Sequence, residues 1–94
     1  MLLKPGVDIS RLNREIRRAL GKIKRACGEF VITSTYEGSH SPWSLHYAND
    51  AIDIRMTSWN GTPISTEILR AELGKDYDVV QESTHIHIEY DPKQ

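Results

Sequence analysis

The four histidines of the chain lie in two short segments, with His40 and His46 in one and His85 and His87 in the other. Asp53 lies between the two segments. Imidazole nitrogens and carboxylate oxygens are ligands that zinc prefers, and three protein ligands leave a fourth tetrahedral position open to water. Zinc lowers the pKa of that water to about 7, so that hydrolysis becomes feasible near neutral pH. These residues therefore predict an open, catalytic type of zinc site.

Alternation along two predicted strands places the candidate ligands on one face. His85, His87 and Glu89 alternate with isoleucines, and Asp53 lies between two isoleucines on its own strand. Successive side chains of a strand point to opposite faces, so the isoleucines can enter the core while the polar groups face the other side. If the two strands are neighbours, Asp53 and the histidine pair share a face, and His46 has only to fold over them.

A hydrolase of this type also needs a general base, and Glu82, three residues before His85, is the best carboxylate candidate. The histidine of the pair that is not a ligand could share in proton transfer or stabilise the developing oxyanion. Each of these residues alone would be interpreted as an ordinary strand or turn residue. The prediction depends on their occurring together.

The elements that position these residues are predicted from hydrophobic periodicity. Apolar residues between Val7 and Cys27 recur every three or four positions, which indicates an amphipathic helix that Asp8 or Ser10 could cap and that ends before Gly28. Strands are expected at 30–35 and 51–55, a short helix at 65–73, and a hairpin of strands at 77–81 and 85–90. This order favours an α+β domain with a small, mainly antiparallel sheet.

Length and composition indicate one globular domain over residues 1–94, and we expect a monomer. The single cysteine, Cys27, excludes an intramolecular disulfide and the cysteine-rich zinc patterns, so a metal site must use histidine and carboxylate. We recognise neither a membrane span nor a signal peptide. A protein that acts on cell wall would then need lysis or another export route.

Charge is distributed unevenly along the chain. Residues 1–27 carry eight Lys and Arg against two acidic residues, whereas the remainder carries four against eleven. Seven of these eight basic residues, all but Lys4, lie on the polar face of the first predicted helix, which we interpret as a solvated face. Contact with an anionic polymer, such as teichoic acid or nucleic acid, is the alternative, and nucleic-acid binding is the weaker form of it.

Two ordered motifs resemble a known group of metallopeptidases. The segment 44–53 (SLHYANDAID) resembles the S-x-H-x-x-G-x-A-x-D signature of zinc D-Ala-D-Ala peptidases. Together with His85-Ile86-His87 it is similar to the wider group that includes lysostaphin-type enzymes and hedgehog domains. The hedgehog branch, including bacterial hedgehog-type domains, agrees best, over roughly residues 32–90. The resemblance implies that fold.

The resemblance also implies a ligand set. It assigns the metal to His46, Asp53 and His87, leaves His85 as a catalytic or supporting group, and makes His40 a further active-site histidine. An alternative alignment to the E-x-x-H motif of the dipeptidases would make His85 the ligand, with Glu82 as the base; we favour His87.

Three positions depart from the family pattern. Asn49 stands in place of a glycine, which is tolerable because asparagine readily adopts a positive φ. Glu37 lies where many of these peptidases carry an arginine, and counting back from His85 places the hedgehog base at Gln81, one residue before Glu82. A calcium site is not expected, because only Glu37 remains of the acidic residues of that loop.

The function that these features favour is a bacterial or phage zinc peptidase, binding one zinc ion, that hydrolyses an amide bond in peptidoglycan stem peptides as a carboxypeptidase or endopeptidase. The alternative is a zinc-binding, hedgehog-like recognition module without efficient turnover, which Gln81 and the missing arginine favour.

Overall fold

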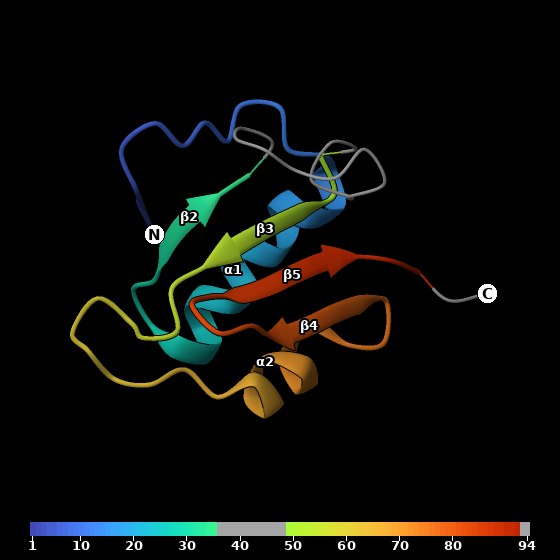
Figure 1. The fold of residues 1–94 in the computed structure, drawn as a ribbon. Helices are drawn as coiled ribbons and strands as arrows, with labels where there is room; N and C mark the ends of the chain where they lie inside the picture. The colour runs from blue at the N-terminus through green and yellow to red at the C-terminus, as the bar shows by residue number, and fades with distance from the viewer. Residues whose placement is uncertain (36–48, 93–94) are drawn as a thin grey trace.

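The sheet and the helices are formed by residues 1–35 and 49–92, which the computed structural model describes. Their arrangement is shown in Figure 1. The elements in chain order are β1 (Leu2–Leu3), α1 (Arg14–Cys27), β2 (Val31–Ser34), β3 (Ala51–Ile54), α2 (Thr66–Leu73), β4 (Tyr77–Gln81) and β5 (Ile86–Tyr90). The predicted α+β class, with a mainly antiparallel sheet and two helices in these residues, is confirmed.

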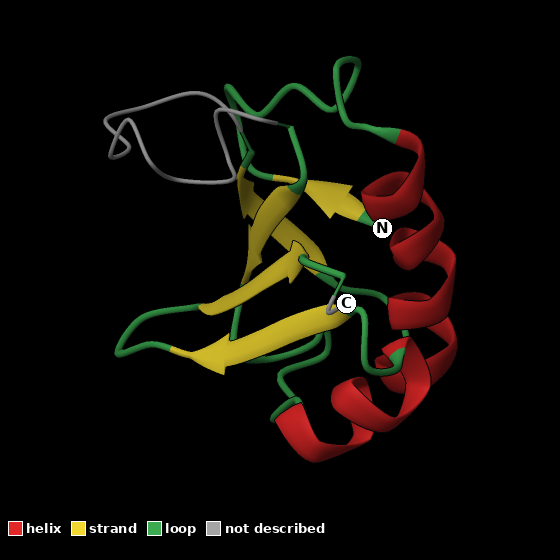
Figure 2. Ribbon diagram, turned by 90° about the vertical axis from the view of Figure 1, so that its right-hand side faces the viewer, coloured by secondary structure: helices red, strands yellow, loops and turns green. Residues whose placement is uncertain are grey.

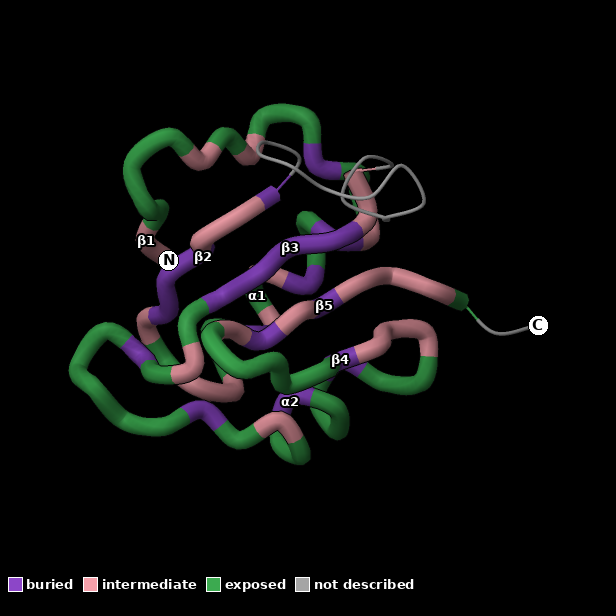
Figure 3. The backbone as a smooth tube through the Cα atoms, viewed as in Figure 1, coloured by how far each residue is buried: buried purple, intermediate pink, exposed green. Residues whose placement is uncertain are grey.

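The five strands form one sheet in the order β1-β2-β3-β5-β4. Strand β3 lies in the middle and pairs antiparallel with both β2 and β5, while the hairpin of β4 and β5 forms the far edge. All four residues of β3 are buried, as its continuous colour in Figure 3 shows. The central strand that carries Asp53 is therefore held on both sides.

Both helices cover the same face of the sheet, so the fold has one helical layer and one sheet layer (Figure 2). The hydrophobic core lies between these layers, because the helices turn their apolar residues toward the apolar face of the strands. Its fully buried members include Ile16, Ile23, Phe30, Ile32, Ile52, Ile54, Leu69, Ile86 and Ile88. The opposite face of the sheet is covered by neither helix.

The first helix begins later than the sequence predicts. It starts at Arg14, and its N-cap residue is Asn13, in an extended conformation, rather than the predicted Asp8 or Ser10. The carboxylate of Asp8 accepts a hydrogen bond from the backbone N–H of Ser10 at 2.8 Å. Because this local turn competes with a helical conformation, the apolar residues before Arg14 pack without extending the helix.

The other helix boundaries agree with the predictions. Gly28 ends α1 with a φ of 76°, and its N–H donates to the carbonyl of Lys24. The hydroxyl of Ser65 accepts from the N–H of Ile68 at the start of α2, and Gly74 ends this helix with a φ of 88°. Glycine is favoured at both ends because an L side chain rarely adopts a positive φ.

The short strand β1 was not predicted. It pairs in parallel with β2, and the N–H of Leu2 donates to the carbonyl of Phe30 at 2.8 Å. Two residues carry no detectable periodicity, so only the neighbouring strand identifies this segment as part of the sheet.

Several basic side chains of α1 have partners within the fold. Arg25 Nε lies 3.3 Å from a carboxylate oxygen of Glu72, and Lys22 Nζ lies 5.9 Å from the ring centre of Tyr77. The other basic residues Arg14, Arg17, Arg18 and Lys24 are exposed, as is Arg25, which agrees with the interpretation of a mainly solvated helix face. In the described part of the chain, neither helix has the length and apolar character that a membrane crossing requires.

Truncation of the core isoleucine Ile88 should destabilise the protein strongly. Ile88 is fully buried and pairs with Ile52 and Val79 on the neighbouring strands. We expect Ile88→Ala to lower the free energy of unfolding by about 2–5 kcal/mol, because it leaves a cavity between the layers. Urea unfolding measures this change. Val80→Ala, at a position that is 44% exposed on the same hairpin, should cost about 0.5 kcal/mol or less; equal losses would contradict the two-layer core.

Candidate metal centre

Asp53 points away from the helical layer. Its neighbours Ile52 and Ile54 are fully buried in the core, so alternation along β3 directs the carboxylate to the other face. The side chain of Asp53 is only 12% exposed. A carboxylate that is this buried requires polar or charged partners.

The register of the sheet brings a histidine directly opposite this carboxylate. Asp53 pairs with His87, and the isoleucines that flank the two residues pair with each other. Directly opposite residues on neighbouring strands have Cβ atoms about 5 Å apart, so their side chains meet on the shared face. The two strands are neighbours, which is the condition under which Asp53 and the histidine pair were expected to share a face.

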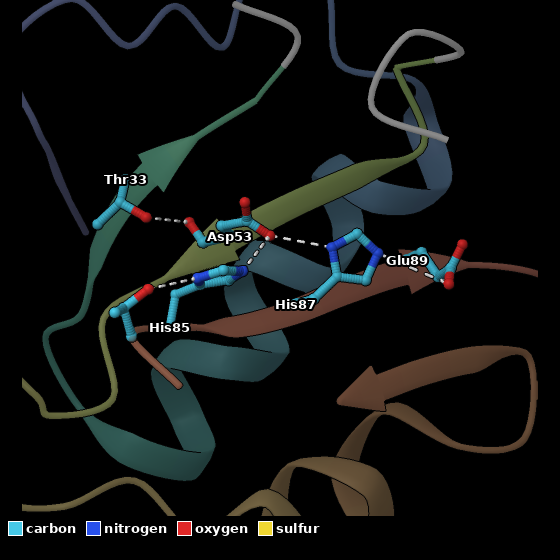
Figure 4. A network of polar contacts seen from close by, with 6 residues as sticks. Thr33, Asp53, His85, His87 and Glu89 are labelled. Carbon is cyan, nitrogen blue, oxygen red and sulfur yellow. Dashed lines mark hydrogen bonds and ion pairs between the residues drawn. The ribbon is translucent and has the colours of Figure 1, made fainter. Parts of the chain in front are cut away.

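Both imidazoles of the pair approach the same carboxylate oxygen, as Figure 4 shows. Nδ1 of His87 lies 2.9 Å from Oδ1 of Asp53, which is hydrogen-bond distance. Nε2 of His85 lies 3.7 Å from the same oxygen. The side chain of His87 is also the more buried of the two, 20% exposed against 32% for His85. His87 is therefore the closer partner of Asp53.

The hydrogen bond with Asp53 raises the pKa of His87 above its usual value. Burial of the ring acts in the opposite direction, while the negative charges of Asp53, Glu89 and Glu82 add to the rise. In the metal-free protein, His87 therefore holds its proton more tightly than a free histidine does. A metal ion bound at Nδ1 would have to displace that proton.

The raised pKa of His87 predicts a pH-dependent contribution to the stability of the metal-free protein. A histidine whose pKa is higher in the folded state stabilises the fold fully below the unfolded pKa of about 6.5, and this stabilisation is lost as pH rises through the folded pKa. We expect the difference in unfolding free energy between the wild type and His87→Gln to be larger at about pH 5.5 than at about pH 8.5. Urea unfolding in the presence of a chelator measures it; a difference that grows with pH would contradict the assignment.

Neighbouring residues orient both rings. The hydroxyl of Thr84 lies 3.0 Å from Nδ1 of His85, which leaves Nε2 of that ring facing Asp53. On the far side of His87, Oε1 of Glu89 lies 3.6 Å from Nε2. Carboxylates in this position commonly fix the orientation of a metal-binding histidine and increase its basicity. No role was assigned to Thr84 or Glu89 from the sequence, although the strand alternation did place Glu89 on this face.

The hairpin register separates Glu82 from Gln81. Gln81 pairs with the core residue Ile86, and its amide contacts the sulfur of Met56 at 3.7 Å. The next residue, Glu82, donates its backbone N–H to the carbonyl of His85 at 2.8 Å. Because a one-residue step reverses the side chain, Glu82 belongs to the face of Asp53 and His87, and Gln81 to the opposite one. The influence of the Glu82 charge on the pKa of His87 agrees with this placement.

Asn49 lies just before β3 and belongs to the sequence motif at 44–53. Asn49, which stands where the resembling family has glycine, adopts a φ of 64°. This is the left-handed region that asparagine tolerates better than most residues. The predicted compatibility of Asn49 with that position is confirmed. His40 and His46, like Glu37, lie outside the described residues.

The described residues supply two of the three predicted ligands. Within residues 1–35 and 49–92, no three His, Cys, Asp or Glu side chains form a group that could hold a metal ion. Two ligands of one tetrahedral zinc ion lie about 3.3 Å apart when each bond is about 2.0 Å. Oδ1 of Asp53 and Nδ1 of His87 are 2.9 Å apart and hydrogen-bonded, so they would have to separate by a few tenths of an ångström to bind one ion. The nearby carboxylates of Glu82 and Glu89 make this face attractive to a cation.

Searches of protein-family models, of curated proteins and of solved structures found nothing that matches this chain. A function for this protein is therefore inferred from the geometry around Asp53 and from the sequence motifs.

Proposed function

We propose that the protein is a zinc-dependent peptidase that hydrolyses an amide bond in peptidoglycan stem peptides. The observation that carries this proposal is the arrangement of Asp53 and His87, which face each other at 2.9 Å on the helix-free side of the sheet. Their spacing in the sequence, together with His46, resembles the signature of zinc D-Ala-D-Ala peptidases and hedgehog-type domains.

In this proposal Asp53, His87 and His46 hold the metal, and His85 does not. Two contacts support His87 over His85 as a ligand: its Nδ1 is closer to the Asp53 carboxylate, and Glu89 lies at its other nitrogen, where a supporting carboxylate would orient the ring. A bound zinc ion would polarise the scissile carbonyl and increase the acidity of the attacking water.

Glu82 and His85 supply the proton chemistry. Glu82, on the same face as the ligands, accepts a proton from the attacking water and delivers it to the leaving amine. His85, held by the hydroxyl of Thr84 at 3.0 Å, directs its Nε2 toward the reacting carbonyl and stabilises the negative charge that develops on its oxygen. His40 remains a candidate for the same role.

Digestion of purified cell wall tests the proposed activity. The zinc-loaded protein is incubated with sacculi and with soluble muropeptides, and mass spectrometry identifies new amino or carboxyl termini. We expect a stem-peptide amide to be cleaved, with the activity lost on chelation and recovered with zinc. Absence of any released fragment between about pH 5 and about pH 9 would contradict the proposal, because zinc-bound water ionises near pH 7, within that range.

A further inference from the structure

Arg55 directly follows the central strand, on the side of the sheet that carries the candidate metal centre. Its backbone N–H donates to the carbonyl of Val31 at 3.0 Å, so the chain is still paired with β2 at this residue. Ile54 is buried in the core, and Arg55 is exposed. Alternation therefore places its side chain on the face of Asp53, two residues away.

The register also places Arg55 next to His85. Ile54 pairs with Ile86, so Arg55, which follows Ile54, lies level with His85, which precedes Ile86. Nε2 of His85 faces Asp53. A group bound by the guanidinium would therefore lie beside the imidazole that faces the site.

The charge around Arg55 is otherwise negative. Strands β2 to β5 contain no Lys or Arg, whereas Asp53, Glu82 and Glu89 all belong to this face. Among the residues that the structure describes, no carboxylate forms an ion pair with Arg55. Away from the bound metal, these carboxylates would repel an anionic substrate group, whereas the guanidinium of Arg55 would attract it.

We propose that Arg55 binds a carboxylate of the substrate and so determines which peptides enter the site. A guanidinium suits this role because its planar N–H groups pair with both oxygens of a carboxylate, which lysine cannot reproduce. Stem peptides offer this group at the C-terminus and at the α-carboxyl of γ-linked glutamate. The inference rests on the proposed peptidase function and adds the substrate group on which recognition depends.

Binding of stem-peptide analogues tests this assignment separately from catalysis. The probe is the pentapeptide L-Ala-γ-D-Glu-L-Lys-D-Ala-D-Ala, prepared with both carboxyls free, with either one amidated, or with both amidated. Nitrogen-15 NMR titration of the metal-free and zinc-loaded Glu82→Gln protein reports peptide affinity and the Arg55 Nε–H resonance. We expect that resonance to shift when the free acid binds. Adding Arg55→Gln to the same protein should lower its affinity for the free acid by about 10-fold or more. Arg55→Lys should restore only part of the lost affinity.

The amidated peptides identify the group that is bound. Amidation of one of the two carboxyls should remove the effect of Arg55→Gln, and the one that does so is the recognised group. Lys75→Gln, a change of the same charge on the loop before β4, should bind like the parent protein. The assignment is overturned if the fully amidated peptide binds as tightly as the free acid, or if Arg55→Gln leaves the affinity for the free acid unchanged. Arg55-dependent binding without turnover by the wild type would instead reject only the peptidase function.

Discussion

Replacing His87 by alanine should lower the affinity of the protein for zinc by about 100-fold or more, because loss of a ligand should exceed the effect of losing a supporting contact. His87 is the histidine that directly contacts Asp53 in the middle of the sheet. Amide hydrolysis should fall to background at zinc concentrations that saturate the wild type. Competition with a chromophoric chelator measures the affinity.

His85→Ala is the matched comparison, because His85 lies two residues away on the same face and also approaches Asp53. This variant should keep its zinc affinity within about tenfold of the wild type, since His85 would act on the substrate rather than on the metal, and its turnover should fall by about 10²–10³-fold. Loss of zinc binding in His85→Ala, with normal binding in His87→Ala, would instead establish His85 as the ligand.

Glu82→Gln should leave zinc binding intact and lower the turnover number by about 10²–10⁴-fold, because the amide cannot accept the proton of the attacking water. Circular dichroism and the chelator titration would verify that the fold and the metal site are unchanged. Steady-state hydrolysis of a stem peptide then gives the turnover number. A turnover number equal to that of the wild type would remove Glu82 from the reaction.

Gln81→Ala provides the control for that experiment. The hairpin register turns Gln81 to the opposite face, where it contacts Met56, so its removal should change neither zinc binding nor turnover appreciably. If the Gln81 variant loses activity and the Glu82 variant does not, the hairpin has a different register from the one described. If zinc is bound but neither the wild type nor any variant hydrolyses peptide, the recognition module becomes the better account.

The sequence predicted the main features of the sheet because alternation along its strands is unusually clear. Isoleucines on both sides of Asp53 and around His87 indicate which face each polar group occupies, and the pairing of Asp53 with His87 fulfils that prediction. The helix α2 was equally predictable, since Ser65 and Gly74 mark its ends. In each case a local pattern and the tertiary contacts favour the same conformation.

Features that depend on contacts distant in the sequence could not be predicted in this way. The start of α1 at Arg14 and the two-residue strand β1 are examples, as their local sequences favoured a longer helix and no strand, respectively. The supporting contacts of Thr84 and Glu89 likewise depend on ring orientations. The placement of Glu82 required the hairpin register, because a shift of one residue would have reversed it.

The central claim is that one zinc ion is bound by Asp53 and His87, and an anomalous-diffraction experiment at the zinc absorption edge tests it most directly. We predict a single strong anomalous peak on the helix-free face, within about 2.0–2.2 Å of a carboxylate oxygen of Asp53 and of Nδ1 of His87, with His46 as the third ligand. Crystals grown with zinc that show Asp53 and His87 still hydrogen-bonded to each other, with no metal between them, would contradict the account.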